Sequence, residues 1–144
     1  MRLASFTDHG LRALMRLAGA PGQAISTGQI AREFRISHHH LAKVVRELGR
    51  GGFVRSQRGR TGGLTLARPA DEVTVGEVVR HLEERHAIVE CFRADGGTCM
   101  LKSTCRLKSR LASAREAFMT DLDRTTLADC AWPGNPPGGP ILAA

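Results

Sequence analysis

The fold of this 144-residue chain is decided by residues 26–69, which read STGQIAREFRISHHHLAKVVRELGRGGFVRSQRGRTGGLTLARP. Ser26 or Thr27 can cap a short helix, and Ser37 can cap the helix that follows. Only residues 34–37 join the two helices, and a glycine pair ends the second one. Apolar residues recur at helical spacing in both: Ile30, Ala31 and Phe34, then Leu41, Val44, Val45 and Leu48. Two short helices joined this tightly indicate a helix-turn-helix.

The remainder of this stretch predicts a β-hairpin. Residues 53–57 and 64–67 are typical of two short strands, and they flank the Gly- and Arg-rich turn RGRTGG. Pro69 ends the pattern. A helix-turn-helix followed directly by strand, basic turn and strand is a wing, so we predict a winged helix-turn-helix DNA-binding domain over residues 1–70.

Helices are predicted on both sides of this unit. Apolar residues in 6–18 form one helical face, and Thr74 with Glu77 makes a capping box for a fourth helix. A long helix is predicted over residues 103–124. Its narrow apolar stripe consists of Leu107, Leu111, Ala114, Phe118 and Leu122. A second copy of the chain is the simplest partner for this stripe, which predicts a homodimer; the alternative is a helix that folds back onto its own domain.

Charge is unevenly distributed along the chain. Residues 1–70 hold 12 Lys and Arg against 3 Asp and Glu, a net charge of +9, whereas residues 71–144 hold 9 against 11, a net charge of −2. The basic half is therefore the expected face for a polyanion. With no Tyr, five Phe and one Trp, the chain offers little surface for stacking single-stranded bases. Double-stranded DNA is the favoured partner.

The third helix is the candidate recognition helix, because its outward face is polar and basic. Residues near its start should reach base edges, and later cations should meet phosphates. The predicted DNA-binding residues are His38, His39, His40, Lys43 and Arg46 on this helix, continued by Arg50, with Arg58 and Arg60 in the wing. Metal binding by the three histidines is the alternative, but consecutive residues of a helix do not face one site.

A cysteine motif of a different character follows. Cys91, Cys99 and Cys105 are spaced C-x7-C-x5-C across an aperiodic loop. Clustered thiols in a reducing compartment favour a soft metal or an iron–sulfur cluster, and three cysteines leave one position for a different, harder ligand. The alternatives are a zinc site completed by His81 or His86, a metal-free thiol sensor, and inert buried cysteines. We expect Cys130 to be a small buried hydrophobe.

Other classes of protein are disfavoured. The chain shows no phosphate-binding glycine motif at a helix start, no HExxH and no GxSxG, so we predict that it is not an enzyme. A protein-binding redox module is the remaining alternative. With no signal peptide and no run of 18 apolar residues, we expect a cytoplasmic protein without a membrane partner. We assign residues 71–130 to a cluster-binding loop and dimerisation helix, and 131–144 to a disordered tail. The predicted fold class is therefore mainly α.

Four segments together resemble a known family. They are the opening MRLASFTDHGLRALMRLA, the segment ISHHHLAKVVRELGRGGFV, the wing RGRTGGLTLARPA, and the cysteine motif followed by RLKSRL. Over about residues 1–130 the chain resembles the NsrR group, the nitric-oxide-sensing repressors within the IscR-type winged-helix regulators. The resemblance implies a homodimer that binds a palindromic operator while an iron–sulfur cluster, 4Fe-4S in preference to 2Fe-2S, is intact. Nitric oxide would attack the cluster and release the DNA.

The same resemblance implies the cluster ligands. Cys91, Cys99 and Cys105 match the group's cysteines, and Asp8 matches a carboxylate ligand donated by the other subunit. IscR itself is the nearest alternative, but its relatives carry His three residues after the third cysteine, where this chain has Lys108. They also lack the aspartate at position 8. The first cysteine gap, seven residues, is at the long end for the NsrR group.

Overall fold

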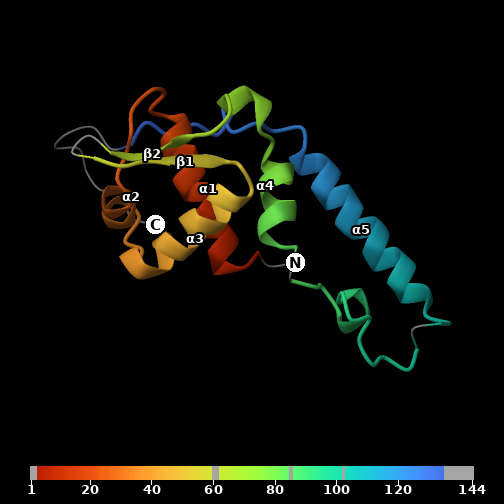
Figure 1. The fold of residues 1–144 in the computed structure, drawn as a ribbon. Coiled ribbons are helices and arrows are strands. Elements are labelled where there is room, and N and C mark those ends of the chain that lie inside the picture. The colour runs from red at the N-terminus through yellow and green to blue at the C-terminus, as the bar shows by residue number, and fades with distance from the viewer. Residues whose placement is uncertain (1–2, 60–61, 85, 102, 135–144) are drawn as a thin grey trace.

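The computed structural model describes residues 3–59, 62–84, 86–101 and 103–134 (Figure 1). In chain order the elements are α1 (Ser5–Ala18), α2 (Thr27–Glu33), α3 (His38–Arg50), β1 (Val54–Gln57), β2 (Gly63–Leu66), a 3-10 turn (Ala70–Glu72), α4 (Val75–Leu82), a second 3-10 turn (Glu90–Phe92) and α5 (Arg106–Leu122). The predicted fold class, mainly helical with a winged helix-turn-helix, is confirmed.

The helix-turn-helix forms where its caps were expected. The Ser26 hydroxyl accepts a hydrogen bond from the Gln29 amide at 3.1 Å, and the Ser37 hydroxyl accepts one from the His40 amide at 3.3 Å. Between the two helices Arg35 adopts a φ of 54°, a left-handed conformation that makes the turn tight. Side-chain caps satisfy amides that the first turn of a helix leaves free, so each serine fixes the start of its helix.

The wing is an antiparallel hairpin, and one further residue pair joins its second strand to the segment before α2. Strands β1 and β2 pair in the register Val54↔Leu66 to Gln57↔Gly63. Ile25, just before α2, pairs with Leu64 through two backbone hydrogen bonds of 3.0 and 2.8 Å. A Cβ atom on Gly63 would lie 2.8 Å from the Ile25 carbonyl carbon, so this close pairing requires glycine. The wing is thereby fastened to the helix-turn-helix.

One hydrophobic core serves both halves of the chain. Its fully buried side chains come from residues before position 70 and after it alike: Leu14, Ile30, Leu41, Val44 and Leu48, with Val73, Val78 and Leu127. The boundary that we expected near residue 70 therefore does not separate two cores. At the centre α1 and α4 approach closely, because a Cβ atom on Gly10 would lie 2.6 Å from Leu82 Cδ1.

Helix α4 begins with half of the predicted capping box. The Thr74 hydroxyl accepts a hydrogen bond from the Glu77 amide at 3.1 Å. The Glu77 carboxylate does not turn back to the Thr74 amide, because it pairs with Arg68 at 2.6 Å instead. The helix nevertheless forms where it was expected, since a single cap and an apolar face suffice.

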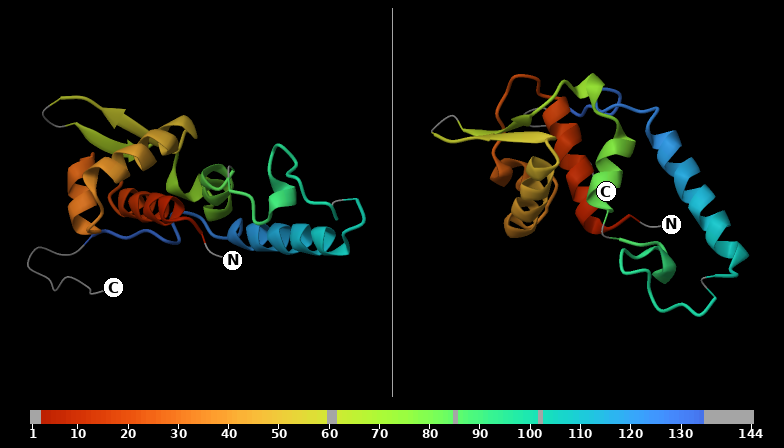
Figure 2. Two further views of the ribbon diagram at one scale, coloured as in Figure 1. Left: turned by 90° about the horizontal axis from the view of Figure 1, so that it is seen from below. Right: turned by 45° about the vertical axis from the view of Figure 1, so that its right-hand side comes forward.

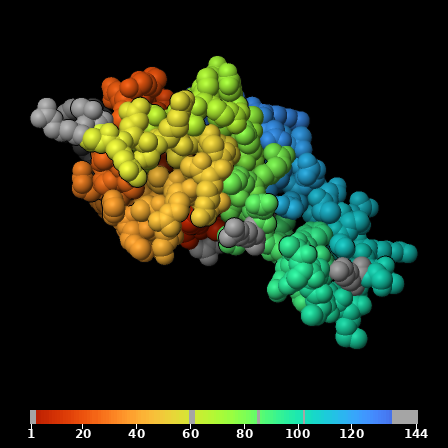
Figure 3. Space-filling model, in the orientation of Figure 1, coloured from red at the N-terminus to blue at the C-terminus, as the bar shows by residue number. Residues whose placement is uncertain are grey.

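Helix α5 extends away from the rest of the molecule (Figures 1 and 2). Its only buried residue is Met119, and Leu107 at its start is 63% exposed. The helix is shorter than the predicted 103–124, because Cys105 is its N-cap residue and Asp123 its C-cap. In the space-filling view the start of α5 and the loop before it project from the main body (Figure 3). None of the described helices has the length and apolarity needed to cross a bilayer.

The first residues of the expected tail are packed. Trp132 donates a backbone hydrogen bond to the Met15 carbonyl at 2.9 Å, and its ring lies 5.0 Å from that of Phe34. Gly19 makes room for this segment, since a Cβ atom there would lie 2.2 Å from the Trp132 carbonyl. Residues 131–134 thus differ from the expected disordered tail; residues 135–144 lie outside the described part of the chain.

Candidate DNA-binding surface and cysteine loop

The outward face of α3 is exposed, as the sequence predicted. His38, His39, Lys43 and Arg46 are all exposed, and so is Arg50, which also pairs with Glu47 at 3.0 Å. Among the described residues no carboxylate lies within 4 Å of Lys43, Arg46 or Arg58. Cations that no acidic group neutralises are the ones available to phosphates.

His40 departs from this pattern. Its ring makes edge-on contacts with two rings of α1, that of His9 at 4.9 Å and that of Phe6 at 6.0 Å between centroids. The Nε2 atom of His40 and the Nδ1 atom of His9 are buried without a hydrogen-bond partner among the described residues. Burial, and secondarily the neighbouring His40, hold the pKa of His9 below its usual value. The structure therefore separates His40 from the residues that we expected it to join on the DNA-reading face.

The wing and α2 contribute further cations. Arg58 is exposed at the end of β1, whereas Arg60 lies outside the described residues. Arg32, which was not predicted to bind DNA, is exposed on α2. Its side chain and that of His38 both lie close to Gly28, because a Cβ atom on Gly28 would be 3.5 Å from the Arg32 guanidinium and 3.8 Å from the His38 ring. No motif in the sequence singles out Arg32.

The cysteine loop is the described chain between α4 and α5 that carries Cys91, Cys99 and Cys105. Cys91 lies in the 3-10 turn Glu90–Phe92, Cys99 in the open part of the loop, and Cys105 at the N-cap of α5. All three are half-buried and none is in a disulfide, as is also true of Cys130. The loop therefore presents three free thiols, the last of them at the first turn of the projecting helix.

A polar clamp draws two parts of this loop together. The Glu90 carboxylate accepts hydrogen bonds from the Thr98 amide at 2.8 Å and the Thr98 hydroxyl at 2.6 Å. These bonds, chiefly that from the hydroxyl, hold the pKa of Glu90 below its usual value. Gly97 allows the close approach with a φ of 59°, and a Cβ atom there would lie 2.6 Å from the Glu90 carbonyl oxygen. Because Glu90 precedes Cys91 and Thr98 precedes Cys99, the clamp brings the first two cysteine segments side by side.

The residues fit an iron–sulfur cluster in chemistry but are not assembled around one point. Three thiols are the donors that such clusters take. In the described part of the chain, however, no three His, Cys, Asp or Glu side chains are arranged to hold a metal ion. His81 and His86, the expected partners of a zinc site, contact other groups: His81 Nε2 lies 3.1 Å from the Glu47 carbonyl and His86 Nδ1 lies 3.5 Å from Glu83. The loop must rearrange for the three thiols to share a centre.

Asp8 lies on α1, apart from the cysteines of its own chain. Its carboxylate forms an ion pair with Arg12 at 2.9 Å, and its side chain is 47% exposed. The start of α1 is instead joined to the end of α4. There the Glu83 carboxylate accepts hydrogen bonds from the Ala4 amide at 2.8 Å and from the Thr7 hydroxyl. Because the cysteine loop begins directly after α4, Glu83 connects α1 to the base of that loop. Neither Thr7 nor Glu83 was predicted from the sequence to have this role.

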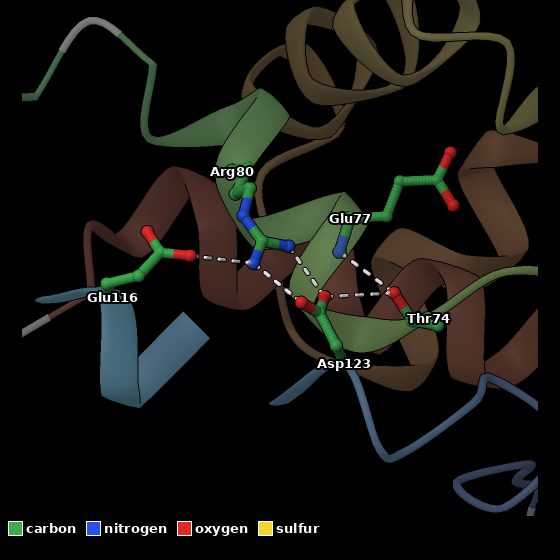
Figure 4. Close-up of polar contacts among 5 residues, drawn as sticks. All are labelled: Thr74, Glu77, Arg80, Glu116 and Asp123. Atoms are coloured by element: carbon green, nitrogen blue, oxygen red, sulfur yellow. Dashed lines mark hydrogen bonds and ion pairs between the residues drawn. The ribbon is translucent and has the colours of Figure 1, made fainter. Parts of the chain in front are cut away.

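The far end of α5 is anchored to α4 (Figure 4). The two guanidinium nitrogens of Arg80 each lie 2.6 Å from an oxygen of Asp123, and a third contact reaches Glu116 at 4.0 Å. The Thr74 hydroxyl donates to the same Asp123 carboxylate at 3.4 Å. Helix α5 is thus bounded by Cys105 at one end and by this joint at the other.

Comparisons with known proteins agree with this architecture. The family model Rrf2, described as an iron-dependent transcriptional regulator, matches residues 3–132. The HTH-type transcriptional regulators NsrR of Geobacillus kaustophilus (strain HTA426) and Shouchella clausii (strain KSM-K16) are 46% and 42% identical to the chain over 90% of its length, covering 88% and 87% of their own.

Solved structures show the same fold. CymR, the global cysteine regulator of B. subtilis, superposes with a TM-score of 0.74 at 31% identity, covering 91% of this chain and 96% of that one. The T. potens IscR structure has a TM-score of 0.71 at 26% identity, with 90% and 85% covered. The fold of this chain is thus shared with CymR and with T. potens IscR.

Proposed function

Because the chain belongs to the Rrf2 family of transcriptional regulators, we propose that it is a repressor whose DNA binding is controlled by an iron–sulfur cluster. The chain is a DNA-binding regulator and not an enzyme. In the proposal, a homodimer binds a palindromic operator while Cys91, Cys99 and Cys105 hold the cluster, and nitric oxide ends that binding. The NsrR relatives and the cysteine loop support this function.

DNA binding is supported above all by basic side chains without an acidic partner, which lie on α3 and in the neighbouring wing. Lys43 and Arg46 on α3 and Arg58 in the wing are exposed and have no carboxylate within 4 Å among the described residues. Recognition helices of this class enter the major groove, and half-sites lie one helical turn or a multiple apart. We propose that His38 and His39, which are exposed at the start of α3, reach base edges.

The cysteine loop supports the sensing part. Its three free thiols suit an iron–sulfur cluster, and 4Fe-4S is the form that we propose in preference to 2Fe-2S. When bound, the cluster would supply iron that reacts with nitric oxide. The chain's own residues would then hold the loop in one shape: Glu90 and Thr98 clamp its first half, and Cys105 ties its second half to α5. Asp8 of the partner subunit is the proposed fourth ligand.

The apolar stripe of α5 is the feature that supports a homodimer. Its stripe residues Leu107 and Ala114 are exposed, and Leu111, Phe118 and Leu122 are only half-buried. An apolar stripe uncovered over much of a 17-residue helix favours a second copy of the same helix as its cover. Thiols that must stay reduced, and an operator as ligand, suit the cytoplasm.

A metal-free thiol sensor is the second candidate. It is favoured by the absence, among the described residues, of any three side chains arranged for a metal ion. An IscR-like or zinc-dependent regulator is a further alternative with less support, because His81 and His86, the expected zinc ligands, contact Glu47 and Glu83 instead of the cysteines.

Anaerobic purification followed by absorption spectroscopy, iron and sulfide analysis and operator gel shifts tests the proposal. We expect a coloured protein that binds the operator and loses both colour and binding after nitric oxide. Cys91→Ser, Cys99→Ser and Cys105→Ser should each lose colour and bind weakly, while Cys130→Ser should do neither. A colourless protein with stoichiometric zinc, or equal operator affinity with and without the cluster, would overturn the proposed switch.

A further inference from the structure

We infer that His40 is a positioning residue and not a DNA contact: through its contact with α1 it sets the orientation of the recognition helix and transmits to it the state of the cysteine loop. The transmission part rests on the proposed function, because that function defines what the loop senses. The positioning part rests on the geometry alone.

Helix α1 contacts the start of α3 through aromatic rings. The His40 ring meets the His9 ring at 4.9 Å with an interplanar angle of 88°, and the Phe6 ring at 6.0 Å and 80°. Edge-to-face rings at these separations attract one another. The neighbouring His38 and His39 are exposed. Of the three consecutive histidines, the third is therefore the one that is partly buried, and it packs against α1 from the first turn of the recognition helix.

Helix α1 is closely packed against its neighbours beside His9. A Cβ atom on Gly10 would lie 2.6 Å from Leu82 Cδ1 and 3.5 Å from Val44 Cγ1, so α1 is in close contact with both α4 and α3 one residue after His9. Close-packed interiors transmit displacement because they have no void to absorb it. A shift of the start of α1 consequently reaches His40.

Helix α1 is connected to the base of the cysteine loop through Glu83. The Glu83 side chain is only 12% exposed, and it accepts hydrogen bonds from the Ala4 amide and from Thr7, which is fully buried. Glu83 is the C-cap of α4, directly before the loop. Any rearrangement of the loop that moves Glu83 therefore pulls on the first turn of α1, and the whole connection lies within one subunit.

Together these contacts form a short path: the base of the loop, Glu83, the first turn of α1, then His40. A path of contacts couples two sites only if it has two arrangements that both sites bias. Two arrangements of the loop are expected, because its three cysteines must move before their thiols can share one centre. The ring of His40 is the point at which this path enters the DNA-reading helix.

The test compares His40→Ala with His40→Phe in the full-length protein. Phenylalanine keeps an aromatic ring against His9 and Phe6 but cannot donate to or accept from a base. We expect His40→Ala to weaken operator binding by about 2- to 10-fold, the range that one aromatic pair provides, and His40→Phe to restore most of that loss. The slope of affinity against salt should be unchanged in both, because no phosphate contact is removed. His39→Ala provides the contrast: it should alter the preference among operators with single base changes.

Two outcomes would overturn the inference. If His40→Phe binds as weakly as His40→Ala and both lose preference at the same base pair, His40 reads DNA. If the ratio of operator affinities with and without the cluster is the same in His40→Ala as in the wild type, His40 does not transmit the state of the loop. A wild-type ratio of one would refute the proposed switch and the transmission with it, while the Ala–Phe comparison would still decide whether His40 positions the helix.

Discussion

Arg80 of α4 and Asp123 at the end of α5 form a bidentate ion pair, with both nitrogen–oxygen distances 2.6 Å (Figure 4). Paired forks of this kind hold both distance and orientation, unlike a single contact. Together with the burial of Met119, the pair therefore helps to fix the angle at which α5 leaves the core. Because the same helix starts at Cys105 and carries the apolar stripe, this angle also sets where the cysteine loop and a second subunit would lie.

Asp123→Asn should lower the melting temperature, and the effect should depend on pH. The hydrogen bond from Arg80 is the main reason that the pKa of Asp123 lies below its ordinary value. A carboxylate with a lowered pKa in the folded state stabilises the protein above its unfolded pKa, about 4, and loses this contribution as the pH falls through the folded value. Thermal unfolding of wild type and variant should differ at neutral pH and converge in strong acid.

Asp121→Asn is the matched control, since Asp121 forms an exposed ion pair with Arg124 through a single contact of 3.6 Å. Exposed pairs contribute little to stability. If both variants shift the melting temperature equally, or if the Asp123→Asn difference persists in acid, the Arg80–Asp123 pair is not what anchors α5.

Gly76→Ala should destabilise the same joint. A Cβ atom at this position of α4 would lie 2.1 Å from the Asp123 carboxylate. Overpacking of this kind costs roughly 1–3 kcal/mol. Gly49→Ala in α3, where a Cβ atom would meet nothing within 4 Å, should instead be neutral or stabilising by up to about 1 kcal/mol. Urea unfolding measures both, and a stable Gly76→Ala protein would show that α5 is free to move away.

Leu111→Glu in α5 should convert a dimer into monomers. The side chain lies on the stripe that the subunit itself covers only partly, so a charge there would be buried between two copies of the helix. Ser113→Glu, exposed and on the opposite side of the helix, is the control. Size-exclusion chromatography with light scattering should give half the mass for the first variant only. A wild type that is monomeric at micromolar concentration would contradict the expectation.

Local signals explain how far the sequence predicts this fold. Ser26, Ser37 and Thr74 cap the helices that they precede, and the glycines around the wing end its strands. These contacts join residues a few positions apart, so composition and spacing suffice. The sequence also contained the signal for His40, which is four residues before the buried Val44 and therefore shares its face of α3.

The connections between distant segments could not be predicted in this way. Thr7 and Glu83 are 76 positions apart, and Arg80 and Asp123 are 43 apart. No periodicity relates such residues, because their contact follows from how helices already formed pack together. The cysteine spacing predicted the proposed donors, but in the described loop the three thiols are not arranged around one point. The clamp between Glu90 and Thr98 is likewise visible only once the loop has folded.

Arg58→Ala should weaken operator binding more at low salt than at high salt. Its guanidinium is exposed at the end of β1, and no carboxylate among the described residues lies within 4 Å of it. Each phosphate neutralised adds about 0.9 to the steepness of the log affinity–log salt plot, so the variant should be shallower by about that amount. Arg124→Ala, in an exposed pair beyond α5, should leave the slope unchanged. Equal slopes for Arg58→Ala and wild type would show that this arginine does not contact the backbone.

Asp8→Ala tests the proposed fourth ligand, and Arg12→Ala is its control. The Asp8 carboxylate pairs with Arg12 at 2.9 Å and is 47% exposed, so it is available at the surface of α1 for a second subunit. Both substitutions break the same ion pair, but only Asp8→Ala removes the oxygen donor.

If Asp8 is a ligand, its loss should change the absorption spectrum of the anaerobic dimer and speed the loss of iron to a chelator, while Arg12→Ala keeps the native spectrum. Because the ion pair is an exposed one between residues four apart, it contributes only about 0.3–0.5 kcal/mol, so both variants should fold. If the two variants behave alike, Asp8 serves only α1, where an acidic side chain in the first turn is favourable, and the fourth ligand lies elsewhere.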